Sequence, residues 1–106
     1  MDLNEYQKMA RTTAIYPSRL DGGMFYPALG LAGEVGELLN KIKKVGRDGK
    51  VLDKEEMAGE LGDVLWYVSQ LAAELGLDMD YIAEKNIKKL KDRMDRNALK
   101  GSGDNR

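Results

Sequence analysis

The sequence of 106 residues contains no histidine and no cysteine. Without cysteine the chain has no disulfide framework and no thiolate zinc site. Without histidine it cannot carry an H-E-x-x-H metalloprotease motif, a Ser-His-Asp triad or the Glu-x-x-His ligands of di-iron bundles. Any general base in this chain is therefore a carboxylate, a lysine, a tyrosine or a metal-bound water.

Long apolar runs are also missing. No run approaches the roughly 18 residues of a membrane span, and the N-terminus lacks the apolar core of a signal peptide. The formal net charge is −1, with 33% charged residues, which gives no sign of a nucleic-acid partner. We therefore expect a soluble, cytoplasmic domain that binds neither nucleic acid nor membrane.

Helical periodicity is present along most of the chain, and nothing resembles a strand. Pro27 suits the first turn of a helix, Asp53 and Asp78 suit N-caps, and Gly76 suits a helix end. These signals predict four helices, over 3–15, from 27 to 45, from 54 to about 75, and from the Asp78 cap to about 99.

The connections between these segments are short, which favours an antiparallel all-α four-helix bundle. We expect one domain over residues 1–100 and a disordered tail over residues 101–106. A chain of this size buries a modest fraction of its surface, so we also expect it to assemble as an oligomer.

The most informative pattern is a repeated acidic segment. Residues 32–38 read A-G-E-V-G-E-L, and residues 58–64 read A-G-E-L-G-D-V. Positions three apart lie on one helix face with Cβ atoms about 5–6 Å apart, so each copy presents a carboxylate pair. At about 100° per residue, both pairs lie at the edge of their helix's apolar stripe. The four acids are Glu34, Glu37, Glu60 and Asp63.

Four carboxylates in one small volume repel one another unless a cation lies between them. Mg²⁺ and Mn²⁺ are the natural candidates, because these hard ions prefer oxygen ligands. The repeat also contains Gly33, Gly36, Gly59 and Gly62, each costing about 1 kcal/mol relative to alanine in a helix interior. Close helix packing and open space for metals and phosphates are two compatible explanations.

The last predicted helix carries different chemistry at the matching edge of its apolar stripe, namely Asn86, Lys89 and Arg93. Acids for a metal, together with lysine and arginine for phosphate oxygens, are what a metal–polyphosphate complex requires. Lys41, just outside the acidic edge of the second helix, is a further candidate for binding phosphate. On their own, these cations are equally typical of a solvated helix surface.

The segments GLAGEVGELLNKIKK, GELGDVLWYVSQLAAELG and KNIKKLKDR together resemble the MazG-type nucleoside triphosphate pyrophosphohydrolases. These belong to the all-α NTP pyrophosphatase superfamily, and this chain resembles its compact single-domain branch. The resemblance implies hydrolysis of a (d)NTP between the α and β phosphates, giving a (d)NMP and pyrophosphate. It implies Mg²⁺, with Mn²⁺ as a substitute, held by Glu34, Glu37, Glu60 and Asp63.

The resemblance further implies that Asn86, Lys89 and Arg93 lie near the metal and phosphates. It also implies dimers or tetramers whose active sites are completed by a neighbouring subunit. We expect Glu37 or Glu34 to accept the proton of the attacking water. The candidates for binding the base are Tyr67, Tyr26, Gln7 and Arg11.

Two other functions stay open on the sequence. A phosphoribosyl-ATP pyrophosphohydrolase has a similar fold and similar acidic motifs. A non-enzymatic helical oligomerisation or regulatory module would carry the same acids as a solvated groove. The preferred base and sugar, the number of metals and the choice between dimer and tetramer are not encoded in these patterns.

Overall fold

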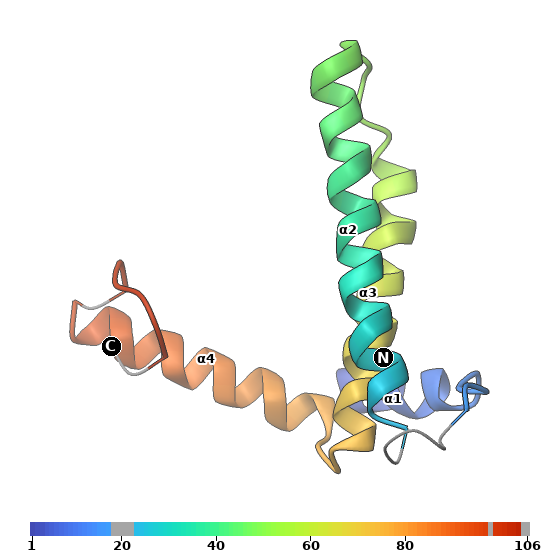
Figure 1. Cartoon of the computed structure of the whole chain (residues 1–106). Coiled ribbons are helices and arrows are strands. Elements are labelled where there is room, and N and C mark those ends of the chain that lie inside the picture. The colour runs from blue at the N-terminus through green and yellow to red at the C-terminus, as the bar shows by residue number, and fades with distance from the viewer. Residues whose placement is uncertain (18–22, 98, 105–106) are drawn as a thin grey trace.

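The computed structural model describes residues 1–17, 23–97 and 99–104, and these residues form helices and no strand (Figure 1). The helices are, in chain order, α1 (Leu3–Arg11), α2 (Phe25–Asp48), α3 (Lys54–Glu74) and α4 (Met79–Asp95). The predicted all-α fold class with four helices is confirmed. Within the described ranges, no helix has the length and apolar character needed to cross a membrane.

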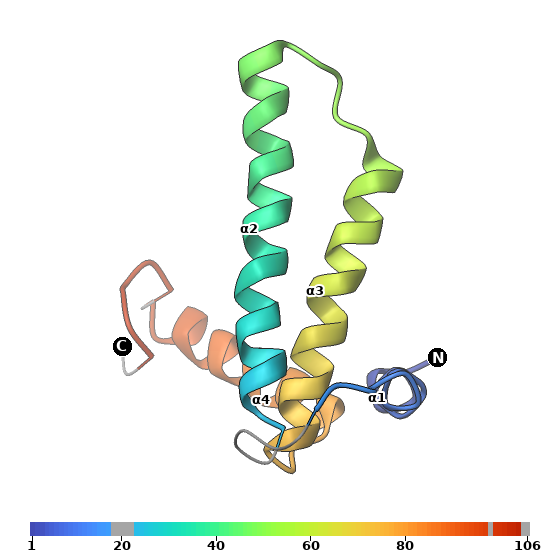
Figure 2. The same ribbon diagram turned by 45° about the vertical axis from the view of Figure 1, so that its right-hand side comes forward.

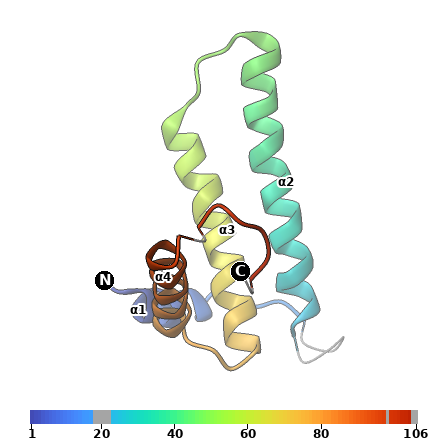
Figure 3. The ribbon, with the colours of Figure 1, turned by 90° about the vertical axis from the view of Figure 1, so that its left-hand side faces the viewer.

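Helices α2 and α3 run antiparallel, side by side, as one long hairpin (Figures 1 and 2). Helix α1 lies across the base of this hairpin, where it contacts both α3 and α4. Helix α4 begins at the base and extends away from the hairpin (Figure 3). The hairpin therefore positions the two acidic segments, and α4 presents most of its surface away from them.

The helix ends follow the local signals in the sequence. The Asp53 carboxylate accepts hydrogen bonds from the backbone N–H groups of Glu55 and Glu56, and the Asp78 carboxylate accepts one from Tyr81 N–H. Gly76 adopts a left-handed conformation, with φ of 72°, directly after the end of α3. The two predicted N-caps and the predicted glycine at the helix end are confirmed.

Helix α2 begins at Phe25, two residues before the predicted start, and the ends of three helices also differ from the predictions by a few residues. Helix α1 ends at Arg11, before residue 15, because the Thr12 and Thr13 hydroxyls donate to the carbonyls of Met9 and Ala10. Helix α2 continues past 45 to Asp48 and ends at the left-handed Gly49, with φ of 67°. Helix α4 stops at Asp95, before residue 99, and is followed by Asn97 with φ of 57°.

The tail contacts helix α4. Of the residues 101–106 predicted as disordered, the structure describes 101–104, and residues 105–106 lie outside the described ranges. Asp104 contacts Lys89 and Arg93 of α4. The disorder of this segment stays a prediction.

Helix α1 is held at the turn between α3 and α4 by Gln7. Its Nε2 donates to the carbonyls of Ser69 (3.2 Å) and Leu77 (3.0 Å), and its Oε1 accepts from Met79 N–H (3.1 Å). One amide side chain thus satisfies three backbone groups on two helices and their connection. The side chain of Gln7 is engaged in positioning α1.

Arg11 provides the second attachment of α1. Its Nη2 donates to Glu74 Oε1 at 2.8 Å, and its Nη1 donates to Gln70 Oε1 at 2.9 Å and to the Tyr16 hydroxyl at 2.7 Å. The Glu74 side chain is only 7% exposed. The hydrogen bond from Arg11 lowers the pKa of Glu74 below its ordinary value, because it favours the charged carboxylate.

The core of the single chain is small. Its buried residues include Ser69, Gln70 and Ala72 of α3, Met79 of α4 and Pro27 of α2. The apolar stripe of the hairpin is only partly covered, since Leu61 remains 54% exposed. Much apolar surface of the hairpin and of α4 is therefore available for contact with another surface.

We expect Glu74→Gln to lower the free energy of unfolding by roughly 1.5–3 kcal/mol at neutral pH, because it removes the charged acceptor of Arg11. A depressed folded pKa stabilises the fold above the unfolded pKa, and this stability is lost as pH falls through the folded pKa. The difference between wild type and variant should therefore be constant above about pH 5.5 and shrink below it. Urea unfolding at several pH values measures it.

The exposed Glu84 of α4 provides the matched control, as Glu84→Gln should change stability by at most about 0.5 kcal/mol. An effect of Glu74→Gln that stays the same at pH 3 and pH 7 would contradict the charged contact.

Candidate metal and nucleotide site

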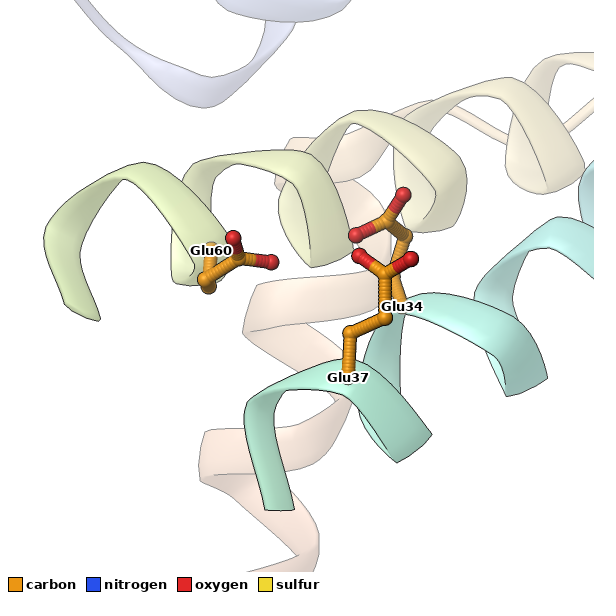
Figure 4. A group of neighbouring side chains, drawn as sticks. All are labelled: Glu34, Glu37 and Glu60. Carbon is orange, nitrogen blue, oxygen red and sulfur yellow. The ribbon is translucent and has the colours of Figure 1, made fainter. Parts of the chain in front are cut away.

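Three glutamates from the two acidic segments meet in the hairpin (Figure 4). Glu34 and Glu37 come from α2 and Glu60 from α3, and each offers a carboxylate oxygen within 4.8 Å of the others. Because all three ligands are carboxylates, the donor set fits a hard divalent cation such as Mg²⁺ or Mn²⁺.

Two oxygens of this cluster lack hydrogen-bond partners. Glu34 Oε2 and Glu60 Oε2 are buried, and neither accepts a hydrogen bond from any residue in the described ranges. Leaving a buried carboxylate oxygen unpaired costs free energy, which a bound cation would offset. Burial raises the pKa of the Glu34 carboxyl, and the neighbouring carboxylates raise it further. The charged form of Glu34 is thus disfavoured until a positive charge approaches it.

The fourth predicted acid, Asp63, lies beside the cluster. It lines a cavity of about 380 Å³ together with Glu34, Thr13, Trp66 and Tyr67. Its negative charge is also among those that raise the pKa of Glu34. Asp63 therefore faces the same space as Glu34, although only Glu34, Glu37 and Glu60 form the tight group.

Lys41, predicted as a candidate for binding phosphate, contacts two carboxylates in this structure. Its Nζ lies 2.6 Å from Glu56 Oε1 and 2.9 Å from Glu60 Oε1. These hydrogen bonds raise the pKa of Lys41 well above its ordinary value, with Glu56 contributing most. Lys41 partly neutralises Glu60, and any phosphate that approached Lys41 would compete with these carboxylates.

Aromatic rings form one wall beside the acids. Tyr26 stacks on Tyr16, with centroids 5.1 Å apart and an angle of 8° between planes. Tyr67 lies 6.5 Å from Tyr26 and 5.1 Å from Trp66, in a T-shaped arrangement with the latter. Of the four residues predicted to bind the base, Tyr67 lines the cavity. Tyr26 does not line it, but its ring lies against that of Tyr67.

Three neighbours of this space were not among the predicted site residues. Thr13 and Trp66 line the cavity, and Trp66 Nε1 donates to Thr13 Oγ1 at 2.8 Å. Tyr6 of α1 has a pKa raised by burial and also by the negative charge of Asp63. The helical period of the sequence could not identify Thr13 and Tyr6. It does not show which residues of α1, and of the segment that follows it, lie near α3.

The remaining predicted residues lie elsewhere in the single chain. Gln7 and Arg11 hold α1 in place and line a separate cavity of about 690 Å³ along α1. The candidates on α4 are carried away from the acidic cluster by the direction of that helix (Figures 1 and 3). Asn86 and Lys89 border a cavity at the start of α4, and Lys89 and Arg93 contact the tail.

Comparison with known proteins gives a family for this site. Residues 27–97 match the MazG nucleotide pyrophosphohydrolase domain. A protein of Mycobacterium phage L5, described as the gene 37 protein, is 43% identical over 114 residues, and the alignment covers 100% of both chains. No solved structure matches the chain.

The chain therefore belongs to the MazG nucleotide pyrophosphohydrolase family, and the resemblance of its three sequence segments is confirmed. Membership supports a pyrophosphohydrolase in general terms. The family is typically metal-dependent, and the acidic group of Glu34, Glu37 and Glu60 is able to hold a metal.

The glycines of the acidic repeat face open space. A Cβ added to Gly33, Gly36, Gly59 or Gly62 would meet no atom within 4 Å in the described structure. Close packing inside one chain therefore does not explain these four glycines. Gly30 is different, because a Cβ there would overlap the ring of Tyr67.

Gly30→Ala and Gly36→Ala form a matched pair on α2 with opposite expected effects. Gly36→Ala should stabilise the fold by roughly 0.5–1 kcal/mol, through helix propensity alone. Gly30→Ala should destabilise it, because overpacking typically costs about 1–3 kcal/mol and the Tyr67 ring is confined by Trp66 and Tyr26. Thermal unfolding of both variants measures this, and equal shifts of the same sign would contradict the close approach at Gly30.

Proposed function

We propose that this chain hydrolyses a nucleoside or deoxynucleoside triphosphate between the α and β phosphates, releasing a monophosphate and pyrophosphate. The observation that carries the proposal is the pair of buried, unpaired oxygens, Glu34 Oε2 and Glu60 Oε2, next to Glu37 in a chain of this family. The cofactor is Mg²⁺, with Mn²⁺ as a substitute.

Glu34, Glu37 and Glu60 would hold the cation, and Asp63 would contribute from the adjoining cavity. When bound, a divalent ion supplies a Lewis acid that polarises phosphoryl oxygens and lowers the pKa of a coordinated water. Glu37 is the most exposed member of the group, so its carboxylate is accessible to accept the proton of the attacking water. Glu34, from the same turn of α2, is the alternative acceptor.

The aromatic wall supports a place for the base. Tyr67 and Trp66 line the cavity that contains Glu34 and Asp63, and Tyr26 lies against Tyr67. Stacking of a base on an aromatic ring contributes roughly 1–3 kcal/mol and accepts every base. The wall explains binding of a nucleotide in general, and it leaves the preferred base open.

Self-association as a homodimer or homotetramer would bring further residues to the site. In one chain, the face of α4 that carries Ile87 (64% exposed) and Met94 (63% exposed) is uncovered, as is Leu61 (54%) of the hairpin. Burying such apolar surface against a second copy is favourable. The same contact would place Asn86, Lys89 and Arg93 of one copy near the acids of another, where they would neutralise the leaving pyrophosphate.

We expect Glu34→Gln to have opposite effects in the absence and presence of a metal. Without metal the variant should unfold at a higher temperature than wild type, because the neutral amide relieves repulsion among the clustered carboxylates. Mg²⁺ or Mn²⁺ should stabilise wild type by about 2.7 kcal/mol at 100 times the dissociation constant, and the variant less. Thermal scans in EDTA and in excess metal measure both effects.

Glu84→Gln serves as the control here as well, since its exposed carboxylate on α4 is outside the acidic group. It should keep the full metal-induced shift. A Glu34→Gln variant that is less stable in EDTA than wild type, yet gains the same stability from metal, would remove the proposed site.

The reaction itself is tested with a panel of NTPs and dNTPs in the presence of Mg²⁺ or Mn²⁺, with the products identified. Wild type should release monophosphate and pyrophosphate. Glu37→Gln and Asp63→Asn should each lower turnover by at least about 100-fold while leaving the helical circular dichroism signal unchanged.

Each other result points to a specific alternative. Diphosphate and phosphate as products would keep the metal site but refute the proposed bond. Turnover of phosphoribosyl-ATP alone would assign the chain to the related hydrolase. No turnover of either substrate class, with both variants unchanged in metal binding, would favour a non-enzymatic helical module.

A further inference from the structure

The C-terminal segment places a carboxylate on the two cations of α4. Lys89 Nζ donates to Asp104 Oδ1 at 3.0 Å, and Arg93 Nη2 lies 3.3 Å from the same oxygen. Arg93 Nη2 also donates to the carbonyls of Asp104, at 2.8 Å, and Gly103, at 3.3 Å. The Arg93 side chain is 4% exposed, whereas that of Asp104 is 81% exposed. A buried guanidinium is thus covered by an exposed carboxylate.

Lys89 and Arg93 are four residues apart in α4, so their side chains lie on one helix face. Two like charges at this spacing repel each other, and an anion between them relieves the repulsion. The single oxygen Asp104 Oδ1 meets both cations, as a phosphoryl oxygen would. The arrangement is an anion-binding pair filled by the chain's own carboxylate.

We propose that the C-terminal segment, residues 101–104, is a tethered competitor that occupies the Lys89–Arg93 pair and is displaced by the polyphosphate of the substrate. The identity of the displacing ligand rests on the proposed function. The contact between Asp104 and the two cations stands on the geometry alone.

The competition is weak enough to be reversible. Exposed ion pairs contribute little to stability, and Asp104 offers one carboxylate that is largely surrounded by solvent. Pyrophosphate carries more charge and more acceptor oxygens, so it makes more charge-assisted hydrogen bonds to the same pair. The tether keeps Asp104 at a high effective concentration, which raises the ligand concentration needed without closing the site.

Titration calorimetry with inorganic pyrophosphate, at low salt and without divalent ions, tests the competition in the full chain. Asp104→Asn should bind pyrophosphate about two- to fivefold more tightly than wild type, because the competing negative charge on Lys89 and Arg93 is lost. Asp92→Asn is the matched control, since Asp92 of α4 pairs with Arg96, the residue that follows this helix, and it should bind as wild type does. Lys89→Gln should bind more weakly.

NMR detects the displacement of the C-terminal segment directly. On addition of pyrophosphate, the backbone amide NMR signals of residues 103 and 104 in wild type should move toward their positions in Asp104→Asn. Equal pyrophosphate affinity of wild type and Asp104→Asn would overturn the proposal. Pyrophosphate binding that leaves these two amide signals unchanged, or no binding at all, would also overturn it.

Turnover separates this proposal from the proposed function. If the chain hydrolyses triphosphates, Asp104→Asn should lower KM about two- to fivefold and leave kcat unchanged. If wild type hydrolyses none, the proposed function is wrong, and the pyrophosphate titration still decides whether the segment competes. Turnover with an unchanged KM in Asp104→Asn would refute the competition and leave the proposed function in place.

Discussion

Repulsion among carboxylates is the constraint on which this structure depends. The antiparallel pairing of α2 and α3 brings Glu34, Glu37 and Glu60 within 4.8 Å, and it leaves a buried, unpaired oxygen on each of Glu34 and Glu60. A fold selected for stability alone would separate these charges or pair all of them. Lys41 offsets part of the charge through its contact with Glu60. The hairpin thus holds an acidic group that is able to bind a cation.

The surroundings of the acids are organised by α1. Gln7 and Arg11 attach this short helix to α3 and to the turn before α4, so that the segment after it can reach the acidic region. There Thr13 accepts the indole N–H of Trp66, and Tyr16 stacks on Tyr26. The polar side chains of α1 thus hold this helix in place, and the rings of Trp66 and Tyr67 on α3 line the cavity. The four glycines of the acidic repeat meet no neighbour within 4 Å in the described structure.

Helix α4 carries both charged side chains and exposed apolar side chains. The helix extends away from the hairpin (Figure 3), and two of its cations, Lys89 and Arg93, contact Asp104 of the chain's own tail. Its apolar face stays exposed, as do several apolar residues of α2 and α3. An anion-binding pair and an uncovered apolar face on one projecting helix are consistent with a site that is completed by self-association. The tail contact then keeps that pair occupied until a stronger anion arrives.

The sequence by itself determined the four helices, their caps at Asp53 and Asp78, the end of α3 at Gly76, the acidic repeat and the family. These depend on local periodicity, on side chains bonding to nearby backbone and on ligand chemistry. Only the tertiary structure decided that three acids converge with Asp63 beside them, that Gln7 and Arg11 hold α1, and that α4 leaves the hairpin. Such features arise from contacts between residues far apart in the chain, and the period of a helix carries no information about them.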